Sequence, residues 1–200
     1  MHARRTALAT ITILAAATLT ACSEPAQGTA ERATAATSSL ASSSPESDAP
    51  PADADEQPDT ELAVGDAFAY TDGLKAMVDS IRTITRFGEY DTKPDANQIP
   101  FRVTFTITNG TKKPYDMDSF SYDAQGATTG GQSEFLYVEA DSKQMAGRLA
   151  VGRSATFTSE YSIAKSDGKD IVFTMSRTDD AWLESGSFLG DDPNWTGTIK

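Results

Sequence analysis

The sequence predicts an all-β domain, an antiparallel β-sandwich of about seven to eight short strands over residues 61–200. The first observation is alternation, because three runs, at 100–110, 154–163 and 170–176, place apolar residues at every second position. This period of two is typical of strands with one buried face. The second is that turn residues such as Asp-Gly, Gly-Gly and Pro separate the runs. The third is that the region has no cysteine, so apolar packing must stabilise it without disulfides.

Taken in order, the clearest strand is PFRVTFTITNG at 100–110. Its apolar residues from Phe101 to Ile107 fall on one face and its threonines on the other, and Asn109-Gly110 predicts the turn that ends it. The runs SATFTSEYSI and DIVFTMS repeat the pattern. Weaker strand candidates lie at 65–70, 73–84, 115–124 and 134–140, and a last short strand is expected within 182–189. A helical turn is expected only at 142–149.

The N-terminus has the pattern of an export signal. Arg4 and Arg5 precede an apolar run at 7–19, which at about 13 residues is too short to span a bilayer but suits a signal peptide. Leu19-Thr20-Ala21-Cys22 follows, and this resembles the bacterial lipoprotein signal, in which cleavage leaves a lipidated cysteine at the mature N-terminus. Cys22 is the one cysteine of the chain, so lipidation also explains a thiol that has no disulfide partner. An ordinary cleaved signal with a chance cysteine is the alternative.

Residues after the signal predict a linker. The segment 23–60 is rich in Ala, Ser, Thr, Pro and acidic residues, and Leu40 is its one large aliphatic residue. Such a segment buries too little apolar surface to offset its ordering entropy. The expected organisation is therefore a signal peptide at 1–21, a lipidated Cys22 with a disordered linker at 22–60, and the sandwich at 61–200.

Charge and composition exclude several functions. The net charge is -12, and no basic cluster is visible along the sequence, so nucleic-acid binding is not expected. His2 is the one histidine and lies in the signal. The exported chain therefore lacks the residues of Ser-His-Asp or Cys-His catalytic sites and of His/Cys zinc sites. No cofactor, metal or catalytic residue is expected.

Two features remain as candidate binding residues. Asp116 and Asp118, in YDMDS, would project from one face if that stretch is extended, and could hold a calcium ion or act as a glycosidase pair. The alternative is a solvated strand face balanced by nearby lysines. Trp195 follows Trp182 and Phe188 in a Gly/Asp-rich segment. Exposed tryptophan would indicate a binding surface, whereas the commoner interpretation is that Trp182 and Phe188 fill the core.

Three stretches resemble a family of secreted domains common in Gram-positive bacteria, to which a small mycobacterial immunogenic protein is similar. They are VGDAFAYTDGLKAMVDSI, PFRVTFTITNGTKKPYDMDS and LAVGRSATFTSEYSI, at 64–81, 100–119 and 149–163. The family pattern is GD-x3-Y-x2-G-L/M-x-V, then V-x-F-x-I-x-N-x3-K-P-Y, then a glycine turn before a late strand. The resemblance implies an immunoglobulin-like sandwich behind a lipoprotein signal and a polar linker. It brings no catalytic residues, and the family's function is largely unknown.

These observations together predict a lipid-anchored protein on the extracytoplasmic face of the cell membrane. Its domain is expected to be a non-catalytic binding or interaction module whose partner is an envelope protein or a wall component. Two alternatives stay open: a domain that binds a small solute or calcium, and a carboxylate-based enzyme that acts on envelope glycans.

Overall fold

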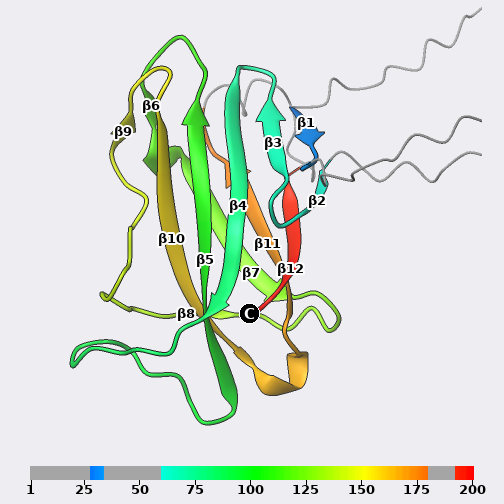
Figure 1. Cartoon of the computed structure of the whole chain (residues 1–200), viewed down its shortest axis with the longest axis vertical. Helices are drawn as coiled ribbons and strands as arrows, with labels where there is room; N and C mark the ends of the chain where they lie inside the picture. The colour runs from blue at the N-terminus through cyan, green and yellow to red at the C-terminus, as the bar shows by residue number, and fades with distance from the viewer. Residues whose placement is uncertain (1–27, 34–59, 180–191) are drawn as a thin grey trace, which may run out of the picture.

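The computed structural model describes residues 28–33, 60–179 and 192–200, and in these ranges the chain forms two packed β-sheets (Figure 1). The predicted all-β sandwich is confirmed. The strands are β1 (Gly28–Glu31), β2 (Glu61–Ala63), β3 (Ala67–Tyr70), β4 (Leu74–Thr83), β5 (Gln98–Asn109), β6 (Tyr115–Asp116), β7 (Phe120–Gly126), β8 (Glu134–Phe135), β9 (Arg148–Leu149), β10 (Ser154–Ala164), β11 (Asp170–Arg177) and β12 (Asn194–Thr198). Two 3₁₀ turns, η1 (Met117–Ser119) and η2 (Lys165–Asp167), join them.

The larger sheet has the order β1-β3-β4-β5-β10-β8, and all its neighbouring strands are antiparallel. Its centre is β5, which pairs with β10 from Gln98 to Thr108 and with β4 on the other side. Strand β5 forms because its residues alternate between apolar and polar, which suits a pleat with one buried face.

The smaller sheet has the order β2-β12-β11-β7. Its strands pair antiparallel except for β2 and β12, which run parallel from the Glu61–Asn194 pair onward. The predicted antiparallel sandwich thus has one parallel pair, β2 with β12, among the strands that the structure describes. The short strands β6 and β9 form a separate two-stranded ribbon.

Side chains from both inner faces form one core. The predicted inward face of β5 is confirmed, since Phe101, Val103, Phe105 and Ile107 are all fully buried. Phe105 contacts Phe173 of β11 across the sandwich, with ring centroids 5.7 Å apart. Contacts of this kind join the two sheets, and burial of each such side chain stabilises the fold by roughly 1.5–3 kcal/mol.

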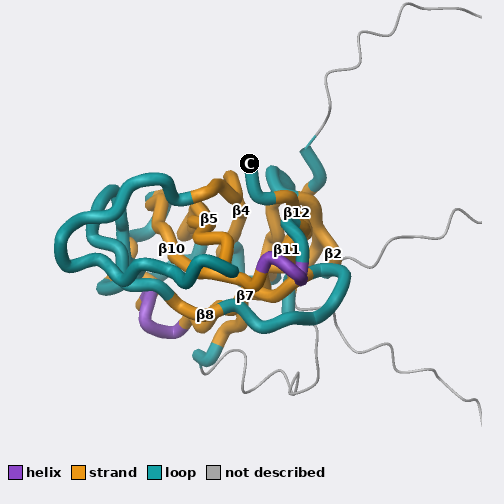
Figure 2. Tube along the Cα trace, turned by 90° about the horizontal axis from the view of Figure 1, so that it is seen from below, coloured by secondary structure: helices purple, strands orange, loops and turns teal. Residues whose placement is uncertain are grey.

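Loops cover part of the outer face of the larger sheet on its β10 side (Figure 2). Leu136 donates its backbone N–H to the Glu160 carbonyl, and Thr158 donates to the Lys143 carbonyl. Ile84, Leu136 and Val138 form a small second core beneath these loops. Because of this cover, Glu160 is buried although it lies on the side of β10 that faces away from the main core.

Three expectations are corrected. Residues 28–31, placed in the linker, form β1 and pair with β3, because Gly28 lets the backbone approach Phe68 so closely that a Cβ would lie 2.4 Å from its ring. The helical turn at 142–149 does not form, because its backbone groups bond to other segments. The Lys143 N–H donates to the Thr158 hydroxyl and its carbonyl accepts the Thr158 N–H, while the Gly147 carbonyl accepts the Met117 N–H. More strands form than the seven or eight expected, because short segments of two to four residues also pair.

Some expectations lie outside the described residues: the signal at 1–21, Cys22, the linker at 34–59 and the strand at 182–189.

Candidate functional site

The acidic pair predicted from the sequence lies at a turn rather than along a strand. Strand β6 ends at Asp116 and η1 begins at Met117, so YDMDS is not extended and the two carboxylates do not share a strand face. The Asp116 carboxylate instead accepts the backbone N–H of Asp118 at 3.1 Å, and both side chains are exposed. No group of three or more His, Cys, Asp or Glu residues with metal-binding geometry occurs within residues 28–33, 60–179 and 192–200.

Trp195 is a core residue, which corrects its selection as a possible binding residue. Its side chain is fully buried, and its indole N–H donates to the Asp66 carbonyl at 2.9 Å. Strand β12 lies between β2 and β11, so its inward residues face the core. Trp182 and Phe188, which precede it in the same Gly/Asp-rich segment, lie outside the described residues.

The residues that carry the family resemblance hold turns. The buried Asp66 carboxylate accepts the backbone N–H groups of Ala63, at 3.0 Å, and of Ala33, at 2.7 Å. The Asn109 side chain is fully buried and donates to the carbonyls of Lys113 and Leu149. These contacts account for the GD and N-x3-K-P-Y patterns as structural motifs.

Arg177 is the centre of a buried cluster at the end of the sandwich where β6 lies. Its guanidinium pairs with Asp72 and Asp179, each at 2.8 Å, and stacks on the rings of Tyr70 and Tyr115. Burial raises the pKa of the Tyr115 hydroxyl, which also donates to Asp179. The positive charge is thus balanced by two carboxylates, and the cluster serves to join β11 to the loops around it.

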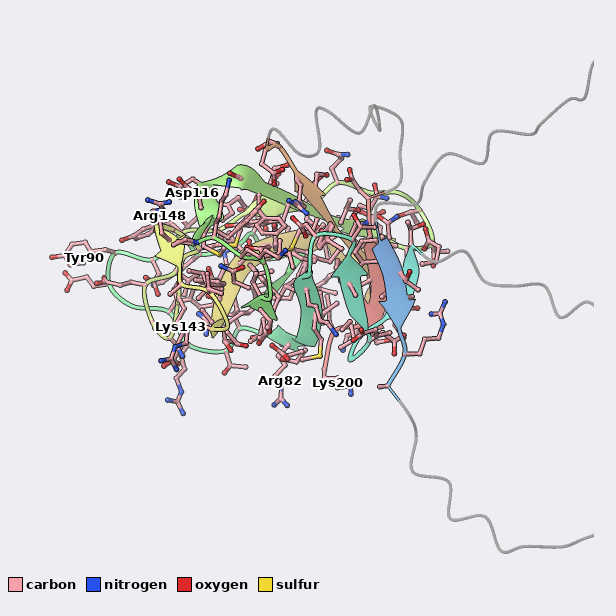
Figure 3. The ribbon with its side chains drawn as sticks, turned by 90° about the horizontal axis from the view of Figure 1, so that it is seen from above. Arg82, Tyr90, Asp116, Lys143, Arg148 and Lys200 are labelled. Carbon is pink, nitrogen blue, oxygen red and sulfur yellow. The ribbon has the colours of Figure 1, made fainter. Side chains whose placement is uncertain are left out.

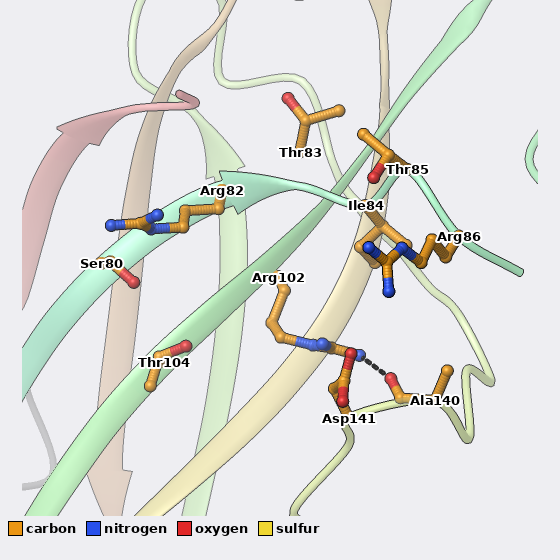
Figure 4. Close-up of a pocket in the computed structure, with 10 residues that line it drawn as sticks. All are labelled: Ser80, Arg82, Thr83, Ile84, Thr85, Arg86, Arg102, Thr104, Ala140 and Asp141. Carbon is orange, nitrogen blue, oxygen red and sulfur yellow. Dashed lines mark hydrogen bonds between the residues drawn. The ribbon is translucent and has the colours of Figure 1, made fainter.

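A different surface combines basic side chains with a hollow. A cavity of about 560 Å³ lies on the outer face of β4 and β5, bounded by Ala140 and Asp141 (Figure 4). A second cavity, of about 320 Å³, continues from β4 toward β12, and the two share Ser80 and Arg82. We call the combined hollow the basic groove; its cations are Arg82, Arg86, Arg102 and Lys200.

A β-bulge in β4 places Arg82 in the basic groove. From Leu74 to Val78 the even-numbered residues face the core, and the register then shifts between Val78 and Ser80. Past this bulge Ile81 faces the core and Arg82 faces outward, opposite Arg102 of β5. A bulge inserts one unpaired residue, here Asp79, and reverses the face on which later side chains lie.

The electrostatics of the groove are unbalanced toward positive charge. Arg102 forms its floor and is fixed by Glu160, at 2.7 Å, and by the Ala140 carbonyl, at 2.5 Å. Arg82, Arg86 and Lys200 are exposed, and no ion pair holds them among the residues that the structure describes. Because Glu160 compensates the charge of Arg102, the positive charge left without an ion-pair partner in the groove comes from Arg82, Arg86 and Lys200.

The groove offers hydrogen-bond donors and positive charge. Its other polar lining is mainly hydroxyl, including Ser80, Thr83, Thr85 and Thr104, while Asp79 and Asp141 are its two acidic side chains. Asp79 accepts a hydrogen bond from Thr106. Figure 3 shows Arg82, Lys143 and Lys200 extending from the same side of the sandwich. This arrangement has the chemistry of anion recognition.

This surface gives no signal in the sequence because its cations are far apart along the chain. Arg82 and Arg86 lie at the end of β4 and just beyond it, Arg102 on β5 and Lys200 after β12. Pairing β4 with β5 would have revealed the two opposed arginines, but the irregular alternation caused by the bulge concealed that register.

No helix in the described part of the chain is long and apolar enough to cross a membrane.

Comparisons with known proteins give only distant matches. No protein-family model and no curated protein matches the chain. Among solved structures, the chain is similar to a "putative lipoprotein (ycdA)" from Bacillus subtilis, with 16% identity and a TM-score of 0.44. That match covers 64% of this chain, which spans 37% of the Bacillus protein.

Two further solved structures are similar at the same level. The yjhA protein from Bacillus subtilis is 14% identical, with a TM-score of 0.48, over 70% of this chain and 99% of that protein. An uncharacterized beta-sandwich protein from Clostridium difficile 630 is 7% identical, with a TM-score of 0.41, over 70% of this chain and 94% of that protein.

Proposed function

We propose that this chain is an exported lipoprotein, held at the outer face of the cell membrane by lipid on Cys22, whose β-sandwich binds another envelope component without chemically changing it. The anchor is supported by Leu19-Thr20-Ala21-Cys22, which follows an apolar segment and holds the one cysteine of the chain. Two acyl chains suffice for stable anchoring. The motif resemblance to secreted Gram-positive domains agrees with this placement.

The observation that carries the binding function is the basic groove. The chain has a net charge of -12, yet four basic side chains and only two acidic ones, Asp79 and Asp141, line this hollow. Three of the four cations, Arg82, Arg86 and Lys200, are exposed, and no ion pair holds them within the described residues. Positive charge gathered on an otherwise acidic surface directs anionic partners to one place.

Anchoring makes a modest affinity sufficient. A tether confines the domain to a thin layer above the membrane and raises its effective concentration toward other envelope molecules. At high local concentration even a site with a Kd of about 1 μM, or roughly -8 kcal/mol, is occupied. The groove is open and its free cations are exposed, which suits such a reversible contact.

The anchor is tested by detergent partitioning and mass spectrometry. The wild-type protein should enter the detergent phase with a mass increment equal to a lipid, and Cys22→Ala should abolish both. An unmodified, water-soluble wild-type chain that begins elsewhere would refute the anchor.

The binding function is tested by photo-crosslinking on intact cells. A photoreactive residue at Thr104, inside the groove, should capture a discrete envelope component, and the same residue at Ser121, exposed on β7, should not. Capture at Thr104 should fall in an Arg82→Gln/Arg86→Gln background. Equal capture from both positions would overturn the assignment to the groove, and saturable turnover of an envelope glycan or peptide would overturn the non-catalytic proposal.

A further inference from the structure

We infer that the basic groove binds a linear polymer of acyclic polyol units joined by phosphodiesters. This inference rests on the proposed function, because it names the ligand class of the same groove. It follows from three features: the spacing of the cations, the presence of carboxylates between them, and the kind of uncharged lining.

The cations are arranged in a row rather than around one point. Lys200 and Arg82 line the second cavity, and Arg82, Arg102 and Arg86 line the first. In Figure 4 the guanidinium group of Arg82 lies well apart from that of Arg86, and the Arg102 guanidinium lies on the Arg86 side, next to Asp141. A compact anion would contact one end only. A linear ligand with charges at intervals could contact each cation in turn.

The carboxylates in the groove limit the charge density of the ligand. Asp141 lies beside Arg102 in Figure 4, and Asp79 lines the second cavity with Arg82 and Lys200. Glu160 already neutralises Arg102 from beneath. The positive charge that remains uncompensated beside each cation of the groove is therefore small. This favours a ligand with one negative charge per unit, such as a phosphodiester, over a phosphomonoester or a sulfate-rich chain.

The uncharged side chains that line the groove indicate which chemical units of the ligand lie between its negative charges. Seryl and threonyl hydroxyls from β4, β5 and β12 line the groove, and these can donate to or accept from the hydroxyls of a polyol. Neither cavity is lined by Phe, Tyr or Trp. Sugar rings and nucleobases are commonly held by stacking on aromatic side chains, and single-stranded nucleic acids depend on it. An acyclic polyol needs no such platform.

Arginine provides the contact to phosphate. A guanidinium presents its donors in a planar fork that matches two phosphate oxygens. Arg102 is held in place by Glu160 and Ala140, so it is pre-positioned at the floor of the groove. Arg82 and Arg86 are free to close on the ligand from either end.

The test uses the chain from Ser23 to Lys200, which keeps every residue that the structure describes, and measures binding by calorimetry. The probes are glycerol phosphate oligomers of one, two and three repeats. Affinity should rise with each repeat. Arg82→Gln and Arg86→Gln should each weaken binding of the three-repeat probe by about 2- to 5-fold, as expected for exposed ion pairs. Asp141→Asn should strengthen binding, because it removes a negative charge and asparagine also tolerates the positive φ of 59° at this position.

The matched control is Arg148→Gln, which makes the same charge change at an exposed residue of β9, next to Asp116 and away from Arg82 in Figure 3. It should leave affinity unchanged. Equal loss in Arg148→Gln would show a general charge effect and overturn the inference. So would equal binding of one and three repeats, or tighter binding of a three-repeat galacturonate oligomer.

Vesicles of phosphatidylglycerol distinguish a polymer from a lipid head group, which has the same phosphodiester chemistry. Groove-dependent binding to vesicles but not to the oligomers would assign the site to lipid and overturn the polymer inference. If no oligomer binds while Thr104 still captures an envelope component in cells, the ligand class is wrong and the proposed function stands. If neither occurs, both fail.

Discussion

Phe105→Ala should be among the most destabilising single substitutions in the domain. The Phe105 side chain is fully buried on β5, and its ring lies within 6.0 Å, centroid to centroid, of the rings of Tyr122, Phe157 and Phe173. Tyr122 and Phe173 belong to the opposite sheet, so the ring joins the two layers. Phe-to-Ala changes in cores cost about 3–5 kcal/mol. Each aromatic contact adds to the burial term, so we expect a loss of about 4–5 kcal/mol.

The control is the next residue on the same strand. Thr106 points to the opposite side, where its hydroxyl donates to Asp79 at 2.8 Å and contacts the Thr156 hydroxyl at 3.0 Å. Its side chain is partly exposed, so Thr106→Ala should cost about 1 kcal/mol or less. The contrast between adjacent positions measures the difference between the two faces of β5.

The assay is urea unfolding of the Ser23–Lys200 chain, followed by circular dichroism, with the melting temperature as a second readout. For a domain of about 140 residues, a loss of 4–5 kcal/mol lowers Tm by roughly 15 °C. The slope of the urea transition should stay constant if the unfolded state is unchanged. Equal losses for Phe105→Ala and Thr106→Ala would refute the argument, because they would mean that both faces of β5 contribute alike.

Three further predictions concern other contacts. Arg177→Ala should lower the free energy of unfolding by about 3 kcal/mol in urea titrations, because it leaves Asp72 and Asp179 without the buried cation that pairs with them; a loss under about 1 kcal/mol would contradict this. Hydrogen bonds from the backbone N–H groups of Glu139 and Gly88 lower the pKa of Asp91 below its ordinary value of 3.8. The ionised Asp91 carboxylate should therefore contribute its full stabilisation above pH 3.8, and this stabilisation should be lost as the pH falls further. The Tm difference between wild type and Asp91→Asn should therefore be constant at neutral pH and shrink below about pH 4, and a difference that grows in acid would have the wrong sign. Millimolar calcium should leave Tm unchanged, and a rise of many degrees that Asp118→Asn abolishes would restore the calcium site.

The sandwich was predictable where local pattern and burial agree. In β5 and β11 every second residue is apolar, and the same residues are buried in the structure. Period two identifies a face without knowledge of the partner strand. Strand β4 was a weaker prediction because its bulge at Asp79 shifts the apolar positions from even to odd numbers, and that shift depends on pairing with β5.

The candidate site could not be predicted in the same way. The cations of the groove come from β4, β5 and the C-terminal end, and only the strand order places them together. Trp195 shows the same dependence on long-range contacts, since a tryptophan among Gly and Asp residues gives no local sign that Asp66 will accept its N–H. Strand β1 forms within a segment of low apolar content because its stabilising contacts are made with an existing sheet edge.

If Cys22 carries the proposed lipid, the docking of β1 limits how far the domain can stand from the membrane. Six residue steps separate Cys22 from Gly28, and even a fully extended chain covers no more than roughly 20 Å over that length. With Cys22 in the bilayer, as we propose, the β3 edge must therefore lie just above the lipid, and β8 at the opposite edge of the same sheet is free to point outward. Ion pairs from Lys75 to Glu31 and from Arg32 to Asp66 help to hold β1 in place. Both ion pairs, and the pairing of Gly28–Glu31 with β3, would have to break before β1 could leave the sheet. Release would leave about 38 residues between lipid and domain, with a contour length above roughly 100 Å. If Cys22 is lipidated as proposed, docked and released β1 would hold the domain at two different heights above the membrane.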